Sequence, residues 1–140
     1  MTIEVIDPGE SKWGEKINSN FSALANNGFD VTSITLTGLN GWSLNGSAFY
    51  ASNGVIQINE LDFTAVPKNA VAAGTLQDII VGQLGHNWPE WTVSFVGNWQ
   101  DATMQMFTIE NRNEIHLHSM GNLVSAGNVL HVHQTTINAI

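Results

Sequence analysis

Residues 104–118 have the pattern of a β-hairpin, and this segment restricts the fold more than any other part of the chain. Four apolar residues alternate with polar residues in its two arms: Phe107, Ile109, Ile115 and Leu117. Successive side chains of a strand point to opposite faces. A three-residue loop, with Asn113 in the left-handed conformation, brings these four onto one face, whereas a two-residue turn at Asn111 and Arg112 would separate them. The sequence therefore predicts a sheet built around this hairpin.

Further strands are predicted on both sides of the hairpin. Asn53-Gly54 is a strong turn signal, and a two-residue turn there places four apolar side chains on one face: Phe49, Ala51, Ile56 and Ile58. Residues 76–84 and 129–137 are also predicted to be strands. Turns recur at about the 8–12-residue spacing of sandwiches and barrels. We therefore expect a mostly β protein, an antiparallel β-sandwich of the jelly-roll or Greek-key type, over residues 46–140.

A single helix is expected before the sheets. Asp7-Pro8-Gly9-Glu10 resembles a helix start, and the following apolar residues recur at helical spacing: Trp13, Ile17, Phe21 and Leu24. This stripe packs either on copies of itself, with Asn20 setting the register, or on the β domain. We favour self-association, which gives a self-associating segment over residues 1–28 and a neck or short strand over residues 29–45.

The composition excludes several classes of partner. Four basic residues stand against twelve acidic ones, and the net charge is −8. Binding to nucleic acid requires a Lys/Arg footprint that this chain lacks. No apolar run approaches the ~20 residues of a membrane span, and residues 1–8 do not resemble a secretory signal. We expect a soluble protein made without a secretory signal of its own, with no nucleic-acid partner and no membrane insertion.

Two His-X-His pairs are the candidate metal ligands. They are His116 with His118 and His131 with His133, and in a strand each pair points to one face. If the two strands were neighbours, four imidazoles would form one patch that suits iron or zinc. The alternative is that histidine is simply an acceptable residue on the wetter face of a strand, and then no cofactor is expected. Glu114 lies on the same face as His116, but one carboxylate is weak support for a catalytic site.

Two loops rich in tryptophan are the candidate ligand site. The residues concerned are His86, Trp88, Glu90, Trp91, Trp99 and Asp101. Sugars stack on aromatic rings while acidic side chains bind their hydroxyl groups, and loops on a rigid sheet often carry such sites. The alternative is that the tryptophans close the ends of the core, and Trp91 fits that alternative best. No Gly-X-Ser-X-Gly motif or phosphate-binding loop is present, so we do not expect an enzyme.

The chain resembles the receptor-binding proteins and tail-fibre heads of tailed bacteriophages. The resemblance lies in residues 13–24 (WGEKINSNFSAL) and in the order of the later hairpins, as in residues 49–58 (FYASNGVIQI), 73–80 (AGTLQDII), 107–118 (FTIENRNEIHLH) and 124–137 (VSAGNVLHVHQTTI). It implies a homotrimer in the virion, made in the host cytoplasm, with residues 1–28 as the trimerisation segment. The N-terminal helix would mount it on other tail or baseplate proteins. The most similar members are baseplate receptor-binding proteins of phages of lactic-acid bacteria.

The resemblance also implies a function. A head of this family binds a cell-wall saccharide with His, Asp and Trp side chains, for which His86, Trp88, Trp99 and Asp101 are the counterparts by residue type. Some relatives bind iron through His-X-His pairs on a threefold axis. The function expected is host attachment by avidity, in which weak sites repeated in a trimer give strong binding. The alternatives are a structural or decoration protein of the virion and a metal-dependent hydrolase.

Overall fold

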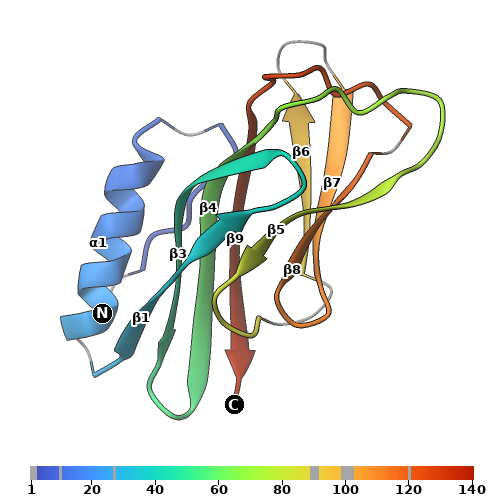
Figure 1. The fold of residues 1–140 in the computed structure, drawn as a ribbon. Helices are drawn as coiled ribbons and strands as arrows, with labels where there is room; N and C mark the ends of the chain where they lie inside the picture. The colour runs from blue at the N-terminus through green and yellow to red at the C-terminus, as the bar shows by residue number, and fades with distance from the viewer. Residues whose placement is uncertain (1–2, 10, 27, 89–91, 99–102, 120) are drawn as a thin grey trace.

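The computed structural model describes residues 3–9, 11–26, 28–88, 92–98, 103–119 and 121–140. The chain forms two antiparallel sheets and one N-terminal helix (Figure 1). Sheet A has the strand order β1 (Asp30–Ile34), β3 (Trp42–Ser52), β4 (Ile56–Pro67) and β9 (Leu130–Ala139). Sheet B has the order β2 (Leu36–Gly38), β5 (Asp78–Leu84), β8 (Glu114–His118), β7 (Thr103–Glu110) and β6 (Thr92–Asn98). The predicted mostly β, two-sheet fold with one short N-terminal helix is confirmed.

The long-range strand pairings are nested. Strand β4 pairs with β9, β5 pairs with β8 inside that pair, and β6 pairs with β7 inside both. In Figure 1 the two sheets face each other, and the last strand, β9, lies beside β4, which is far from it in sequence. Although β8 and β9 follow each other in sequence, β8 lies in sheet B and β9 in sheet A.

The β7–β8 hairpin has the predicted register. Phe107 lies opposite Leu117 and Ile109 opposite Ile115, around a three-residue loop at residues 111–113. The prediction of a left-handed Asn113 was wrong, because the residues with positive φ are Asn111 (47°) and Arg112 (75°). Either backbone conformation makes a three-residue loop, so the strand register is the same in both cases.

The predicted face of the β3–β4 hairpin is confirmed, but its turn lies one residue later. Ala51 pairs with Ile58, and the amide of Asn53 donates to the carbonyl of Ile56, so Gly54 and Val55 occupy the turn. Gly54 has a φ of +85°, which suits the first central position of a type II′ turn. The register changes by two residues, which leaves every side chain on its predicted face.

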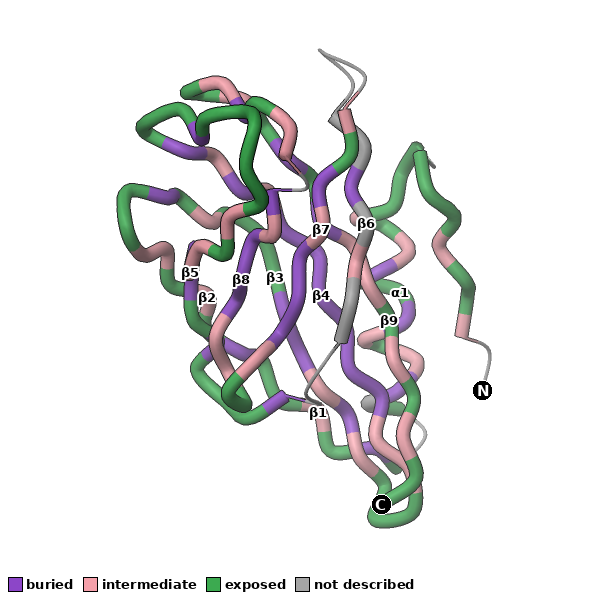
Figure 2. The backbone as a smooth tube through the Cα atoms, turned by 90° about the vertical axis from the view of Figure 1, so that its right-hand side faces the viewer, coloured by how far each residue is buried: buried purple, intermediate pink, exposed green. Residues whose placement is uncertain are grey.

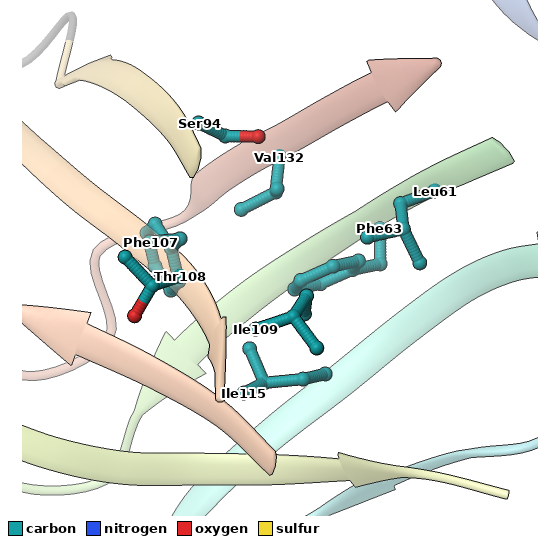
Figure 3. A pocket seen from close by; sticks show the side chains of 8 residues that line it. All are labelled: Leu61, Phe63, Ser94, Phe107, Thr108, Ile109, Ile115 and Val132. Atoms are coloured by element: carbon teal, nitrogen blue, oxygen red, sulfur yellow. The ribbon is translucent and has the colours of Figure 1, made fainter. Parts of the chain in front are cut away.

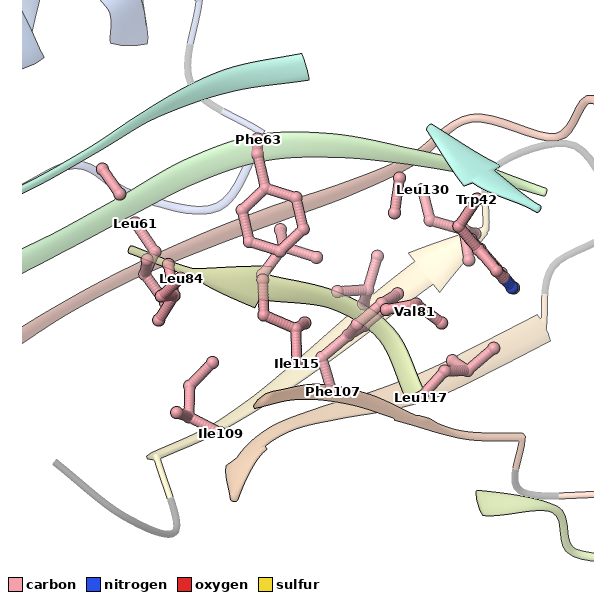
Figure 4. Close-up of a cluster of buried hydrophobic side chains, with 14 of the residues drawn as sticks. Trp42, Leu61, Phe63, Val81, Leu84, Phe107, Ile109, Ile115, Leu117 and Leu130 are labelled. Atoms are coloured by element: carbon pink, nitrogen blue, oxygen red, sulfur yellow. The ribbon is translucent and has the colours of Figure 1, made fainter. Parts of the chain in front are cut away.

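The core lies between the sheets. Leu61 and Phe63 from sheet A meet Phe107, Ile115 and Leu117 from sheet B, and each of the five side chains is at most 2% exposed (Figure 4). Figure 2 shows that burial follows the central strands β4, β7 and β8. Since alternate residues fill this core, the residues between them point to the outer faces.

An interior space beside Phe63 and Phe107 is too small for an organic ligand. Its lining residues are Leu61, Phe63, Ser94, Phe107, Thr108, Ile109, Ile115 and Val132 (Figure 3). The cavity volume is about 10 Å³, which is room for roughly one water molecule. This space in the sandwich core is therefore no ligand site.

Helix α1 (Trp13–Asn26) covers the outer face of sheet A (Figure 1). Ile17 and Leu24 are buried against a cluster that includes Phe49, Ala51 and Ile58. This packing is the alternative that the sequence left open beside self-association. Self-association through α1 stays a prediction, and it would have to use surface other than these buried side chains.

The helix begins later than predicted, and the predicted neck is part of the sandwich. Residues 8–9 form a turn before α1 instead of its first helical turn. Within residues 29–45, β1 pairs with β3 and β2 pairs with β5. The segment cannot act as a separate neck, because its backbone groups complete the ladders of both sheets.

Asn20 fastens the N-terminal segment to the helix. Its side chain is buried, its Oδ1 accepts from the Glu4 amide (2.8 Å), and its Nδ2 donates to the Glu4 carbonyl (2.8 Å). Ile3 and Ile6, on either side of Glu4, pack against the same apolar cluster as the helix. Asn20, the polar residue within the apolar stripe, thus makes its hydrogen bonds within one chain.

Replacing Asn20 should loosen this segment. Asn20→Ala removes both hydrogen bonds and is expected to lower the free energy of unfolding by roughly 1–2 kcal/mol and to speed amide exchange at Glu4. Denaturant unfolding and hydrogen exchange measure the two effects. Asn18→Ala, at an exposed position of the same helix, is the control. Equal stability of the two variants would contradict this role of Asn20.

Candidate metal centre

Three strands of sheet B bring acidic and histidine side chains together on its outer face. His118 lies opposite Asp78 of β5, and His116 lies opposite Thr108 of β7. Glu110, two residues after Thr108, points to the same face because side chains alternate. The residues next to them in each strand point into the core, so the strand register places these side chains on the outer face.

The four potential ligands converge closely. One ligand atom from each of Asp78, Glu110, His116 and His118 lies within 4.8 Å of the other three. The shortest separations are 2.7 Å between His116 Nδ1 and Asp78 Oδ1 and 2.8 Å between His118 Nε2 and Glu110 Oε1. Ligands about 2.1 Å from a tetrahedral ion lie about 3.4 Å apart, so small rotations of these side chains would admit an ion. We call this group the sheet B cluster.

A second layer of hydrogen bonds orients the sheet B cluster. Glu114 Oε2 lies 3.0 Å from His116 Nε2, and the Asn111 amide donates to the same oxygen (2.7 Å). The Thr108 hydroxyl donates to Glu110 Oε1 (2.6 Å) and lies 3.0 Å from His118 Nε2. Carboxylates behind metal-binding histidines are typical of metal sites, because they fix the ring and increase its basicity.

The pKa values in the cluster reflect its paired charges. Burial works to lower the pKa of His116, but the facing carboxylates of Asp78 and Glu114 outweigh it, so this pKa lies above its usual value. Burial works to raise the pKa of Glu110, but hydrogen bonds with Thr108 and His118 outweigh it, so that pKa is lowered. Hydrogen bonds from Asn111 and then from His116 lower the pKa of Glu114. The lowered pKa values of Glu110 and Glu114 favour their ionised forms, and this negative charge favours the approach of a cation.

The donor set suits a transition-metal ion. Two imidazole nitrogens and two carboxylate oxygens match zinc, iron or manganese better than calcium, which takes oxygen ligands alone. His116 is 7% exposed at its side chain and Asp78 is 53% exposed, so the ligands extend from the interior to the surface. An ion at this position would be partly open to solvent.

The two histidine pairs do not form one patch, because the condition for it, that their strands are neighbours, is not met. His116 and His118 lie on β8 in sheet B, whereas His131 and His133 lie on β9 in sheet A. The outer faces of the two sheets point away from each other, so the pairs cannot share an ion. The nested pairing, which local patterns do not reveal, is the physical reason.

His131 and His133 belong to a second group of ionisable residues, beside helix α1. His131 Nε2 lies 2.6 Å from Asp62 Oδ1, and His133 lies 3.9 Å from both Asp62 and Glu60. The side chains of Asp62 and Glu60 are 1% and 4% exposed. We call Glu60, Asp62, His131 and His133 the helix-covered cluster, because they lie on the face of sheet A that carries α1.

Burial dominates the charges of the helix-covered cluster. It raises the pKa of Glu60 to about 7, against a hydrogen bond from Thr135 that lowers it and with a contribution from the negative charge of Asp62. Burial also lowers the pKa of His133. Burial therefore favours the protonated form of Glu60 below about pH 7 and the neutral form of His133, which reduces the charge of this cluster.

Only part of the predicted ligand site lies in the described residues. His86 is exposed, and its ring stacks on Tyr50 at a centroid distance of 4.4 Å. Trp88 is 4% exposed and belongs to the core, so it cannot stack on a sugar without unfolding, and its predicted role as a ligand is corrected. The remaining predicted residues lie outside the described part of the chain: Glu90, Trp91, Trp99 and Asp101.

Asp78 and Glu110 are the two residues of the sheet B cluster that the sequence analysis missed. Glu110 shares the outward parity of Thr108 and lies opposite Glu114 across the hairpin, so the predicted register already placed it. Asp78 lies next to His118 only through the pairing of β5 with β8. No local signal in residues 76–84 indicates that pairing.

Comparison of the chain with protein-family models, curated proteins and solved structures finds no match. In the described residues, no helix combines the length and the apolar character needed to cross a membrane. The functional argument therefore rests on the side chains themselves.

The raised pKa of Glu60 predicts how stability depends on pH in metal-free buffer. In the unfolded chain Glu60 ionises above its ordinary value of 4.5, while in the folded chain it stays protonated up to about pH 7. Glu60 therefore destabilises the fold progressively as the pH rises from 4.5 to 7. Glu60→Gln should unfold at equal free energy near pH 4 but be more stable than the parent at pH 8, by roughly 1–3 kcal/mol.

Urea unfolding across this pH range measures the difference. Glu15→Gln, at an exposed position of the helix, is the control and should follow the parent protein. A Glu60→Gln variant that is less stable than the parent at pH 8 would show that the buried carboxylate is needed in its ionised form.

Proposed function

We propose that this chain is a metal-binding β-sandwich that holds a divalent transition-metal ion in the sheet B cluster. The observation that carries the proposal is the convergence of Asp78, Glu110, His116 and His118 within 4.8 Å. The position of Glu114 behind His116 supports it, because that carboxylate would orient the ring toward an ion. The net charge of −8 favours the approach of cations.

Metal binding should be direct to measure and dependent on pH. We expect the parent protein to bind zinc, and Glu110→Gln with His118→Gln to weaken binding at this site by more than about tenfold, because two ligands are lost. Binding should also weaken as the pH falls through the raised pKa of His116, since protons then compete for the ring. Native mass spectrometry before and after a chelator, and calorimetric titration with zinc, measure these effects.

His86→Gln is the matched control, because His86 is an exposed histidine whose described partner is the ring of Tyr50. It should bind zinc as the parent does. Zinc affinity that is the same in the parent and in the Glu110→Gln/His118→Gln variant would reject the sheet B cluster as the site.

We further propose that the molecule acts in adhesion on a phage particle, as a homotrimer attached to other tail proteins. The resemblance of residues 13–24 and of the hairpin order supports this role, and so does a surface poor in charge, since charged residues make up only 11% of the chain. The exposed His86 ring on Tyr50 offers an aromatic and hydrogen-bonding surface for a saccharide. If the rings of His86 and Tyr50 bind no saccharide, the alternative is a structural protein of the virion.

Saccharide binding is tested at His86. His86→Ala should weaken binding of the protein to host cell walls by several-fold in each site, and more in a trimer, because avidity multiplies the loss. A pull-down with purified cell walls measures the effect, and native mass spectrometry of the same sample reports whether the protein is a trimer. Asn87→Ala, at the next exposed position of the loop, is the control.

Trp88→Ala is not a useful test of this site. Because Trp88 is buried in the core, the substitution should lower stability by roughly 3–5 kcal/mol, whatever the protein binds. If the His86→Ala variant binds cell walls as well as the parent does, His86 is not part of the saccharide site.

A further inference from the structure

The tip of the β3–β4 hairpin carries one of four Asn-Gly steps in the sequence. The four asparagines are Asn27, Asn40, Asn45 and Asn53. An asparagine in this position can lose its side-chain amide spontaneously when the glycine nitrogen attacks the side-chain carbonyl carbon. Glycine has no side chain to hinder that close approach. Which of the four asparagines reacts therefore depends on how the structure holds each side chain.

The Asn53 carboxamide is folded back over the peptide that would attack it. Its Oδ1 accepts hydrogen bonds from the amides of Val55 and Ile56, both at 2.9 Å. These two residues directly follow Gly54, so the bonds keep the side-chain carbonyl of Asn53 beside the Gly54 nitrogen. The side chain is thus held in the compact conformation that ring closure requires.

The same two hydrogen bonds prepare the carbonyl for attack. When a nitrogen adds to Cγ of Asn53, negative charge develops on Oδ1. Donors that already point at this oxygen stabilise the charge without any rearrangement of the turn. The amides of Val55 and Ile56 are such donors.

The attacking nitrogen has a proton acceptor beside it, and solvent can reach the site. The Gly54 amide donates to Ser52 Oγ at 3.2 Å, so this hydroxyl can accept the amide proton as the new bond forms. Asn53 and Gly54 are both exposed. A Cβ atom on Gly54 would meet no atom within 4 Å, so water has access to the turn.

Two of the other Asn-Gly steps are held in arrangements that oppose the reaction. Asn40 Nδ2 donates to the Ile80 carbonyl at 2.8 Å, which fixes this carboxamide against another part of the chain. Asn45 and Gly46 lie inside β3, where pairing with β4 fixes the backbone. A Cβ atom on Gly46 would overlap the Asp62 carbonyl, so this backbone is also tightly packed. Asn27 lies outside the described residues.

We infer that Asn53 is a site of spontaneous deamidation, at which the turn forms a cyclic imide and then aspartate or isoaspartate. In the first step the Gly54 nitrogen bonds to Cγ of Asn53, the Cγ–Nδ2 bond breaks, and ammonia leaves with the proton of the Gly54 amide. In the second step water adds to one of the two ring carbonyls and opens the ring. Solvent water is the only other reactant. This modification is independent of the proposed metal site.

Deamidation would alter the tip of sheet A. Either product adds a negative charge to a chain whose net charge is already −8, and isoaspartate also adds a carbon atom to the backbone of the turn. The carbonyl of Val55 accepts from the Ile140 amide at 2.9 Å. A changed turn should therefore loosen the contact between the hairpin and the residue that follows β9.

Ageing of the folded protein in mildly alkaline buffer, followed by peptide mass spectrometry, tests the inference. Asn53 should convert at least about tenfold faster than Asn40 or Asn45, because two donors stabilise the charge on its Oδ1. In water labelled with heavy oxygen, the product should contain one labelled oxygen atom. Amide hydrogen exchange should become faster at Ile140 in the aged protein.

Urea-unfolded protein and two variants show whether the fold is responsible. In urea the three asparagines should convert at similar rates, because the hydrogen bonds of the turn are lost. Ser52→Ala should slow conversion of Asn53 several-fold by removing the proton acceptor. Ser47→Ala, at an exposed position of the same strand, is the control and should convert as the parent does.

Two results would overturn the inference. One is conversion of Asn40 or Asn45 in the folded protein at the rate of Asn53. The other is slower conversion of Asn53 in the folded protein than in urea, which would show that the bonds from Val55 and Ile56 protect the side chain.

Discussion

Phe107 lies opposite Leu117 and Ile109 opposite Ile115, and this register decides which side chains leave the core. A slip of one residue would turn the apolar side chains of one arm outward and carry histidine into the space between the sheets. Burying an imidazole and its carboxylate partners there would cost several kcal/mol without new hydrogen bonds. The hydrophobic core and the sheet B cluster are therefore two consequences of one pairing.

Strand β4 applies the same constraint to sheet A with a different outcome. Leu61 and Phe63 point into the core, so Glu60 and Asp62 must point outward. On sheet B the outward carboxylate of Asp78 remains half exposed, but on sheet A the outward carboxylates are buried. The apolar contacts of α1 with Phe49 and Ile58 hold the helix on this face. The cost of burying two acids is thus imposed by packing a few residues away, and it appears as the raised pKa of Glu60.

The parts of this structure that follow from local pattern could be predicted from the sequence. The alternation of apolar residues set the β7–β8 register, the apolar face of the β3–β4 hairpin and the positions of β5 and β9, because side-chain parity is a local property of a strand. The apolar stripe located helix α1 within a few residues. The candidate histidines of β8 were identified for the same reason.

Long-range pairing and burial could not be predicted in this way. That β8 and β9 belong to different sheets depends on nested contacts between residues far apart in sequence, and Asp78 joins His116 only through them. Trp88 has the same local appearance whether it covers the core or a ligand, and only the packing decides. The predicted turn conformation was also wrong. Asn111 and Arg112 adopt the left-handed conformation that had been predicted for Asn113.

The contrast between the two clusters follows from what lies over each sheet. A half-exposed Asp78 leaves one side of the sheet B cluster in contact with solvent, so an ion there can keep water as a ligand and exchange with the medium. In the helix-covered cluster the carboxylates are almost fully buried and the Trp13 ring lies on His131. The same two residue types thus form a converging, partly exposed set of ligand atoms on sheet B and a buried group of ion pairs beneath the helix.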